Sequence, residues 1–371
     1  FVVSLTAIIP ISAIVRLATK DITLKLQTRD HEFLAGLFNG LFGNCAELCF
    51  ALTATMKGKS AVAQTTLTGS IISYCLISFG TCLIFGGISR ERQSYPMIIA
   101  RTNAQLLVVS LISITLPTAF KTWSEATSAE DHSGPLLISH GSAIVLLLEF
   151  ASYILFFYHT HIQTDHTTPA PSLPEGLIVA GFVPALLGQS NLPPVPFRTL
   201  RDLRTAAQDS RSQDDRPQYP IYVAVFVLMS GITAQVFASI FILEAIDSPV
   251  RSMRLSKSFV GLVIMPLVIS SVEHLTAALR SHKDGIAWVT EVAFGSCIRI
   301  TLFVFPLAVI VGWIAGVPGM SMIFDGFQVT ILALTILLVN HVIQNGFLHW
   351  IEGTLFISSF LLFAITVWHY P

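Results

Sequence analysis

The sequence has few charged residues for its length. Of its 371 residues, 12% are charged and 53% are hydrophobic, and the mean hydropathy is +0.71. A soluble domain of this size carries roughly 25% charged residues. The deficit therefore excludes an ordinary soluble domain and indicates a protein that crosses the lipid bilayer several times. The formal net charge of −1 leaves no excess of positive charge for binding nucleic acid.

Several chemical motifs are also missing. The five cysteines all lie in apolar runs, and their spacing fits neither a secreted disulfide framework nor a zinc site. The sequence contains no H-E-x-x-H zinc motif and no G-x-S-x-G nucleophile elbow. An intramembrane hydrolase that uses embedded Ser and His is therefore disfavoured. We expect no enzyme activity and no cofactor.

Apolar segments of membrane-spanning length fill most of the chain. A bilayer core about 30 Å thick takes about 20 apolar residues in a helix. The first segment begins at once with Phe1, and we interpret it as a span of a longer chain rather than as a signal peptide. Ten segments are predicted to span: 1–17, 33–56, 61–87, 100–120, 135–158, 220–244, 258–280, 285–314, 323–343 and 351–370.

Two of these segments carry an acidic residue in the same local pattern. Glu47 precedes a Gly-Ser pair by 22 positions, Glu273 precedes another by 22 positions, and the two acids are 226 residues apart. A carboxylate inside a bilayer is costly, so each acid is a candidate functional residue. The duplication indicates two related halves, which we place at 1–158 and 220–371.

The residues between the halves, 159–219, are rich in Pro, Ser, Thr, Arg and Asp, and we interpret them as a linker. Of the 21 Lys and Arg residues, fourteen lie on the predicted linker side, six lie on the opposite side and Arg299 lies inside a segment. Basic connections stay in the cytosol, so we expect a cytosolic linker. With this threading, the acid-bearing segments have opposite orientations. Inverted repeats of this kind place the substrate site near the middle of the membrane.

Two convergent carboxylates suit a hard cation. Calcium takes six to eight oxygen ligands from carboxylates, carbonyls and side-chain amides or hydroxyls. Glu47 and Glu273 would neutralise its charge, and Asn44 and Ser270 are candidates for neutral oxygens. Magnesium fits less well because it loses water reluctantly, while sodium remains an alternative.

The same acids would couple the cation to protons. Burial disfavours the charged form of a carboxyl group, so protons and calcium would compete for the same oxygens. A thousandfold calcium gradient costs about 4.1 kcal/mol, whereas each pH unit is worth about 1.4 kcal/mol per proton. More than one proton per ion is therefore needed, and two carboxyls would carry that number.

Three stretches resemble the signatures of one membrane-protein family. Residues 36–48, followed by Lys57-Gly58, resemble the first signature of the vacuolar calcium/proton exchangers. Residues 255–262, through Glu273-His274, resemble the second, and residues 348–353 are similar to the last turn between helices.

The resemblance covers nearly the whole chain. It implies an all-α fold of two inverted five-helix repeats with broken or re-entrant helices, like the sodium/calcium exchangers, with an eleventh, preceding helix outside this chain. It also implies that Glu47 and Glu273 bind calcium, that Asn44 assists and that His274 borders the site. The implied activity is calcium/proton antiport into a vacuole or another acidic organelle. The choice between calcium and manganese and the oligomeric state stay open.

Some positions depart from the family pattern. Ile269 and Ser270 stand where the second signature has Gly-Asn, and Arg299 stands where the family has Gln. A guanidinium about 6 Å from a divalent cation would repel it by roughly 5 kcal/mol at an effective dielectric constant near 20. A non-transporting relative with a scaffold or regulatory role, or a sodium-coupled exchanger, therefore remains an alternative. Gln64 and His274 are candidates for a proton relay or for a supporting role beside the ion.

Overall fold

A computed structural model describes most of the chain. It covers residues 1–27, 32–88, 93–94, 97–126, 133–155, 219–247, 255–284, 286–317, 319–343 and 347–370. The predicted linker, 159–219, lies outside these residues except for Tyr219. The division into two halves and a linker stays a prediction.

The described chain is almost entirely helical. Two short strands, β1 (Gln93–Ser94) and β2 (Phe347–Leu348), pair antiparallel, with Gln93 opposite Leu348. The helices of the first half are α1 (Val2–Gln27), α2 (Glu32–Phe42), α3 (Cys45–Met56), α4 (Ser60–Ser73), the π-helix η1 (Tyr74–Ser78), α5 (Phe79–Gly87), α6 (Met97–Ala126) and α7 (Ser133–Leu155). Those of the second half are α11 (Ile221–Ala245), α13 (Lys257–Phe259), η3 (Val260–Ile264), α14 (Met265–Ile269), α15 (Ser271–Asp284), α16 (Ile286–Arg299), η4 (Ile300–Val304), α17 (Phe305–Ile314), α18 (Gly326–Ile343) and α19 (Trp350–His369).

The helices confirm an all-helical membrane protein. In the described part of the chain, eight helices are long and apolar enough to cross a membrane, and two bent pairs raise the number to as many as ten. The bent pairs are Phe33–Phe42 with Cys45–Met56, and Lys257–Ile269 with Ser271–Ser281. Helices suit this setting because they satisfy every backbone hydrogen bond within the segment, where no water is available. All ten predicted segments correspond to one of these spans.

The first span is longer than its sequence predicts, and this corrects the placement of three charges. Helix α1 runs to Gln27, so Arg16, Lys20 and Lys25 lie in a helix and not in a connection. The helix tolerates Lys25 because its ammonium group pairs with Asp21 at 2.9 Å, one turn earlier. Arg16 lies deeper and pairs with a residue of the other half, so it does not count toward the loop charges.

The two halves repeat one another in their helix boundaries. Helices α4 and α16 begin at Ser60 and Ile286, and their π-helical continuations η1 and η4 begin at Tyr74 and Ile300. Each pair is separated by the same 226 residues that separate Glu47 from Glu273. The repeat seen in the sequence is therefore a repeat of local backbone structure.

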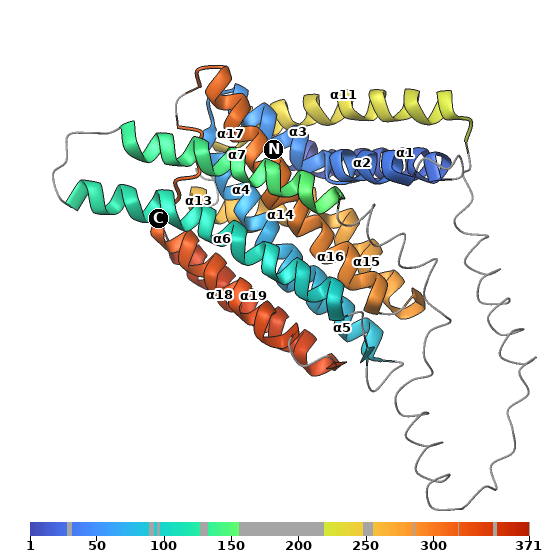
Figure 1. Ribbon diagram of the computed structural model, residues 1–371. Helices are drawn as coiled ribbons and strands as arrows, with labels where there is room; N and C mark the ends of the chain where they lie inside the picture. Colours follow the sequence, from blue (N-terminus) through green and yellow to red (C-terminus); the bar gives the residue numbers. More distant parts are fainter. Residues whose placement is uncertain are drawn as a thin grey trace, which may run out of the picture.

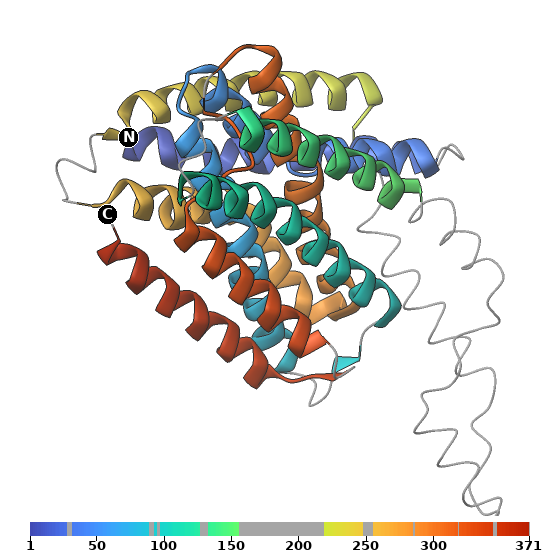
Figure 2. The same ribbon diagram turned by 60° about the vertical axis from the view of Figure 1, so that its left-hand side comes forward.

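The halves interlock at the centre of the molecule. Helices α1 and α11 lie side by side along one edge (Figure 1), and they remain adjacent when the molecule is turned (Figure 2). Helix α4 crosses the η3 segment so closely that a Cβ on Gly69 would overlap the carbonyl oxygen of Leu262. A Cβ on Gly261 would in turn overlap the Thr65 hydroxyl. Glycine at these two positions therefore lets the first half pack directly against the broken helix of the second.

Candidate functional site: a polar cluster between two broken helices

A helix break precedes each of the two acids. Helices α2 and α3 meet at Gly43-Asn44 with a bend of 49°, and α14 and α15 meet at Ser270 with a bend of 54°. Glu47 and Glu273 therefore lie in the first turns of α3 and α15. The first turn of a helix has free backbone N–H groups and a partial positive charge, which favour a carboxylate. The breaks thus place both acids where a buried negative charge costs least.

Glu47 is held by groups from both halves. Its side chain is buried, and its Oε1 accepts hydrogen bonds from the Ser270 hydroxyl at 2.6 Å and the Tyr74 hydroxyl at 3.0 Å. The Asn44 amide donates to the Tyr74 oxygen at 3.4 Å. The other carboxylate oxygen of Glu47, Oε2, is buried without a hydrogen-bond partner. One oxygen of this carboxylate is therefore fixed by two hydrogen bonds, and the other is buried without one.

Glu273 has a different set of neighbours. Its Oε1 lies 3.4 Å from Nη1 of Arg16, and its Oε2 is buried without a hydrogen-bond partner. The next residue, His274, places its Nε2 3.3 Å from the Ser73 hydroxyl, and its ring meets the Tyr74 ring edge-on at 4.9 Å. The second acid is thus tied to the first half through α1 and through the end of α4.

Arg299 joins the cluster from the opposite side. Its Nε donates to Oδ1 of Asn44 at 2.6 Å, and its Nη2 donates to the Ser296 hydroxyl at 2.8 Å. The guanidinium lies over Gly43, where a Cβ would come within 2.9 Å of Nε. Within the described ranges, the arginine forms no ion pair with an acid, and its hydrogen bonds go to Asn44 and Ser296. It binds the amide oxygen predicted as a cation ligand.

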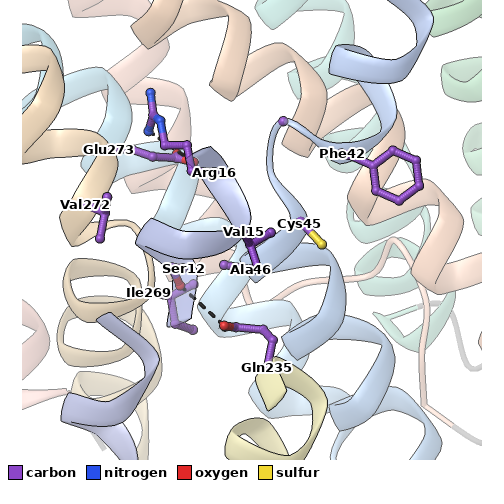
Figure 3. A pocket seen from close by; sticks show the side chains of 11 residues that line it. Ser12, Val15, Arg16, Phe42, Cys45, Ala46, Gln235, Ile269, Val272 and Glu273 are labelled. Carbon is purple, nitrogen blue, oxygen red and sulfur yellow. Dashed lines mark hydrogen bonds and ion pairs between the residues drawn. The ribbon is translucent and has the colours of Figure 1, made fainter. Parts of the chain in front are cut away.

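A small pocket opens beside Glu273. Its volume is about 20 Å³, which is room for about one water molecule. Figure 3 shows Arg16 and Glu273 together at one end and the hydrogen bond from Ser12 to Gln235 at the other. The side-chain nitrogen of Gln235 is buried without a partner. The pocket is therefore bordered by polar groups from α1, α11 and α15.

The structure brings most of the predicted site residues together. The side chains of Glu47, Asn44 and Ser270 form one hydrogen-bonded network that includes Tyr74, and His274 packs against the same tyrosine. The Ser270 hydroxyl donates to the acid of the other half and keeps its oxygen lone pairs, so its predicted role as a neutral ligand stays a prediction.

Gln64 is placed elsewhere. Its amide donates to the carbonyl oxygens of Ser321 at 2.7 Å and Ile323 at 3.3 Å. This side chain therefore fastens α4 to the segment before α18.

Sequence reasoning missed two members of the cluster. Arg16 was counted with the charges of the connections because it lies at the end of the predicted segment, 1–17, although the apolar pattern continues through Ala18 and Ile22. Tyr74 carried no motif. Comparison of the two repeats marks it, because the equivalent position in the second half is Ile300. The available signal is a polar residue in one repeat whose equivalent position in the other repeat is apolar.

The atoms of the cluster that could coordinate a cation are oxygens of carboxylates, hydroxyls and one amide. Such oxygens bind hard cations and protons rather than soft metals. Among the residues that the structure describes, no three His, Cys, Asp or Glu side chains gather to hold a metal ion permanently. The fold and the cluster together define a multi-pass membrane protein with a buried, oxygen-lined site built by two repeats.

Comparison with known proteins identifies the family. The family model described as "Sodium/calcium exchanger protein" matches residues 1–159 and 222–369, so the chain belongs to the sodium/calcium exchanger family. This confirms the resemblance that the sequence signatures indicated.

Relatives match along the whole chain. The "Vacuolar calcium ion transporter" of Schizosaccharomyces pombe is 30% identical over 371 residues, which cover all of this chain and 79% of that protein. The "Ca(2+)/H(+) antiporter" of Aphanothece halophytica is 27% identical and covers all of this chain, which spans 90% of that protein. The solved structure "Structure of native YfkE" superposes with a TM-score of 0.72 at 21% identity, covering 99% of this chain and 91% of that one. This last match confirms the fold.

Proposed function

We propose that this protein exchanges calcium for protons across a membrane by alternating access, and that Glu47 and Glu273 bind the ion. One observation carries the proposal: the Ser270 hydroxyl, at the break of the second half, donates to Glu47 of the first half at 2.6 Å. The acid of the first repeat is thereby hydrogen-bonded to the residue at the break that precedes the acid of the second repeat. The names of the relatives, a vacuolar calcium transporter and a calcium/proton antiporter, support the same substrates.

The free oxygens define what the cluster can bind. Oε2 of Glu47 and Oε2 of Glu273 are both buried without hydrogen-bond partners. A buried carboxylate oxygen without a donor is costly unless it receives a proton or a cation. Calcium would neutralise both acids at once, while two protons would neutralise them separately. Exchange of one calcium for more than one proton follows from this competition.

The remaining polar groups position the acids. Tyr74 and Ser270 hold Oε1 of Glu47 and leave Oε2 directed to the ion. Asn44 offers an amide oxygen, and His274 lies one residue beyond Glu273 against Ser73, where it can support or relay a proton. We place the protein in the membrane of a vacuole or another acidic organelle, with residues 159–219 on the cytosolic side. Manganese is a second candidate substrate.

The test is proton-driven calcium uptake into liposomes that contain the purified protein and an acidic interior. Glu47→Gln and Glu273→Gln each replace an ionisable carboxyl group by a neutral amide of similar size, so we expect at least a hundredfold slower uptake. Glu149→Gln is the matched control, because Glu149 also lies within an apolar helix, α7, but outside the cluster. A sodium gradient in place of the proton gradient tests the sodium-coupled alternative. Normal uptake by the Glu47→Gln protein would refute the site.

Tyr74→Phe tests the positioning role. The variant keeps the ring against His274 and removes the 3.0 Å hydrogen bond to Glu47. A hydrogen bond to a charged group contributes about 1.5–3 kcal/mol, so the apparent calcium affinity should fall by about tenfold or more. Tyr153→Phe in α7 is the control. An unchanged calcium dependence in the Tyr74 variant would show that the hydroxyl does not orient the acid.

A second candidate function is a family member that does not transport. The observation in its favour is that arginine side chains occupy two proposed ligands: Arg299 binds the Asn44 oxygen, and Arg16 pairs with Glu273. In that case the purified protein would neither take up calcium nor bind it. The same liposome and binding measurements decide between the two functions.

A further inference from the structure

The two acids of the repeat do not have equivalent partners. Glu47 accepts from Ser270 and Tyr74. At the 226-residue offset, the position equivalent to Tyr74 is Ile300, which has no hydroxyl, and the position equivalent to Ser270 is Asn44. The Asn44 amide nitrogen donates to Tyr74, and its oxygen accepts from Arg299. The hydrogen bonds that fix the first acid therefore have no counterpart at Glu273.

Arg16 takes their place. Among the residues that the structure describes, its guanidinium is the charged group within 4.0 Å of the Glu273 carboxylate, at 3.4 Å. Helix α11 begins 219 positions after α1, and at that offset the position equivalent to Arg16 holds the uncharged Gln235, so this arginine also breaks the repeat. Only the first half carries a charged side chain at this position, and this side chain pairs with the acid of the second half. The difference indicates a function specific to Glu273.

The ion pair is loose and faces a pocket. Nη1 of Arg16 and Oε2 of Glu273 are both buried without hydrogen-bond partners, and both residues border the 20 Å³ pocket shown in Figure 3. The Arg16 side chain is 31% exposed, compared with 12% for Glu273. In the described part of the chain, the guanidinium is therefore held by charge rather than by a network of hydrogen bonds.

A cation and Arg16 cannot share Glu273. Calcium bound to the pairing oxygen would lie about 2.3–2.6 Å from it, and the guanidinium nitrogen lies 3.4 Å from the same oxygen. The two cationic groups would then be no more than about 6 Å apart. At an effective dielectric constant near 20, their repulsion would lower the affinity by more than about a thousandfold. Arg16 must therefore leave before the ion binds.

We propose that Arg16 is a tethered counter-ion, which occupies Glu273 when no cation is bound and competes with the transported cation for that acid. The inference rests on the proposed function and adds a residue that sets the apparent affinity. By neutralising Glu273, the guanidinium stabilises the unloaded site, and the cation must displace it. Arg16 acts on transport through Glu273, so it is a positioning residue.

Arg16→Gln tests this competition. We expect the KM for calcium to fall by up to about fivefold, the value of a partly exposed ion pair, with no rise in kcat. Arg16→Lys, which keeps the charge, should retain most of the parental KM. Lys25→Gln is the matched control, because it removes a positive charge from the same helix at a residue paired with Asp21. In the double variant Arg16→Gln/Glu273→Gln, the effect of the arginine change should disappear.

A second readout does not depend on transport. Calcium should raise the melting temperature of the Arg16→Gln protein in detergent at lower concentrations than it does for the parent. Equal calcium responses of parent and Arg16→Gln, both abolished by Glu47→Gln, would overturn the inference and leave the proposed function intact. If calcium raised the melting temperature of Arg16→Gln but not that of the parent, the result would support the inference and show that Arg16 blocks the site of the parent. No response in any variant would overturn both.

Discussion

Replacement of Arg299 by Gln should increase calcium affinity. The arginine donates from Nε to Oδ1 of Asn44 at 2.6 Å, so it occupies one oxygen proposed to ligate the ion. Glutamine has a shorter side chain with no charge, and it leaves Asn44 free to turn its oxygen toward the cation.

The geometry gives the magnitude. A calcium ion about 2.6 Å from the Asn44 oxygen would lie no more than about 5.2 Å from the guanidinium nitrogen, because that nitrogen is 2.6 Å from the same oxygen. At an effective dielectric constant near 20, the repulsion of a divalent cation is then roughly 6 kcal/mol. This value applies to the arginine as it stands, and movement of this long side chain away from the ion would reduce it. A tenfold gain in affinity, equal to 1.4 kcal/mol, is the minimum that we expect.

Calcium binding to the purified protein is the direct assay, and proton-driven uptake into liposomes is the functional one. Arg299→Lys loses the planar guanidinium group but keeps the positive charge. Because the charge remains, this variant should bind calcium no better than the parent. Arg280→Gln, on α15, controls for the general loss of a positive charge. Identical calcium dissociation constants for the parent and Arg299→Gln would refute the electrostatic reasoning.

Two further predictions concern stability. Gly69→Ala should lower the unfolding free energy by about 1–3 kcal/mol, because its Cβ would overlap the Leu262 carbonyl oxygen; Gly141→Ala, with no atom within 4 Å, is the thermal-melting control. At the membrane edge, the Tyr370 hydroxyl donates to Asp325 at 2.7 Å, and this hydrogen bond raises the pKa of Tyr370 above its usual 10.0. Its contribution to stability is therefore present below pH 10 and lost as the pH rises through the raised pKa. The stability difference between the parent and Tyr370→Phe should shrink over that alkaline range, and a pH-independent difference would contradict this.

Much of the architecture followed from local sequence patterns. The length of each apolar run set the spans, because the thickness of the bilayer fixes the length of a helix that crosses it. The resemblance to the exchanger family implied broken helices, and the repeated acid marked the two segments in which the structure shows them. The end of α1 was predicted ten residues too early, because Arg16, Lys20 and Lys25 look like a loop when read without their partners.

The sequence by itself determined which segments are long and apolar enough to cross the membrane, and that two of them carry an acid in the same local pattern. Only the tertiary structure decided what those acids meet. The Ser270–Glu47 hydrogen bond joins residues 223 positions apart, and the Arg299–Asn44 hydrogen bond joins residues 255 positions apart. Hydrophobic length and helix breaks are properties of neighbouring residues, so they can be read along the chain. The partner of a buried charge depends on how the two halves pack, and a single sequence does not give the spatial distance between residues that are far apart in the chain.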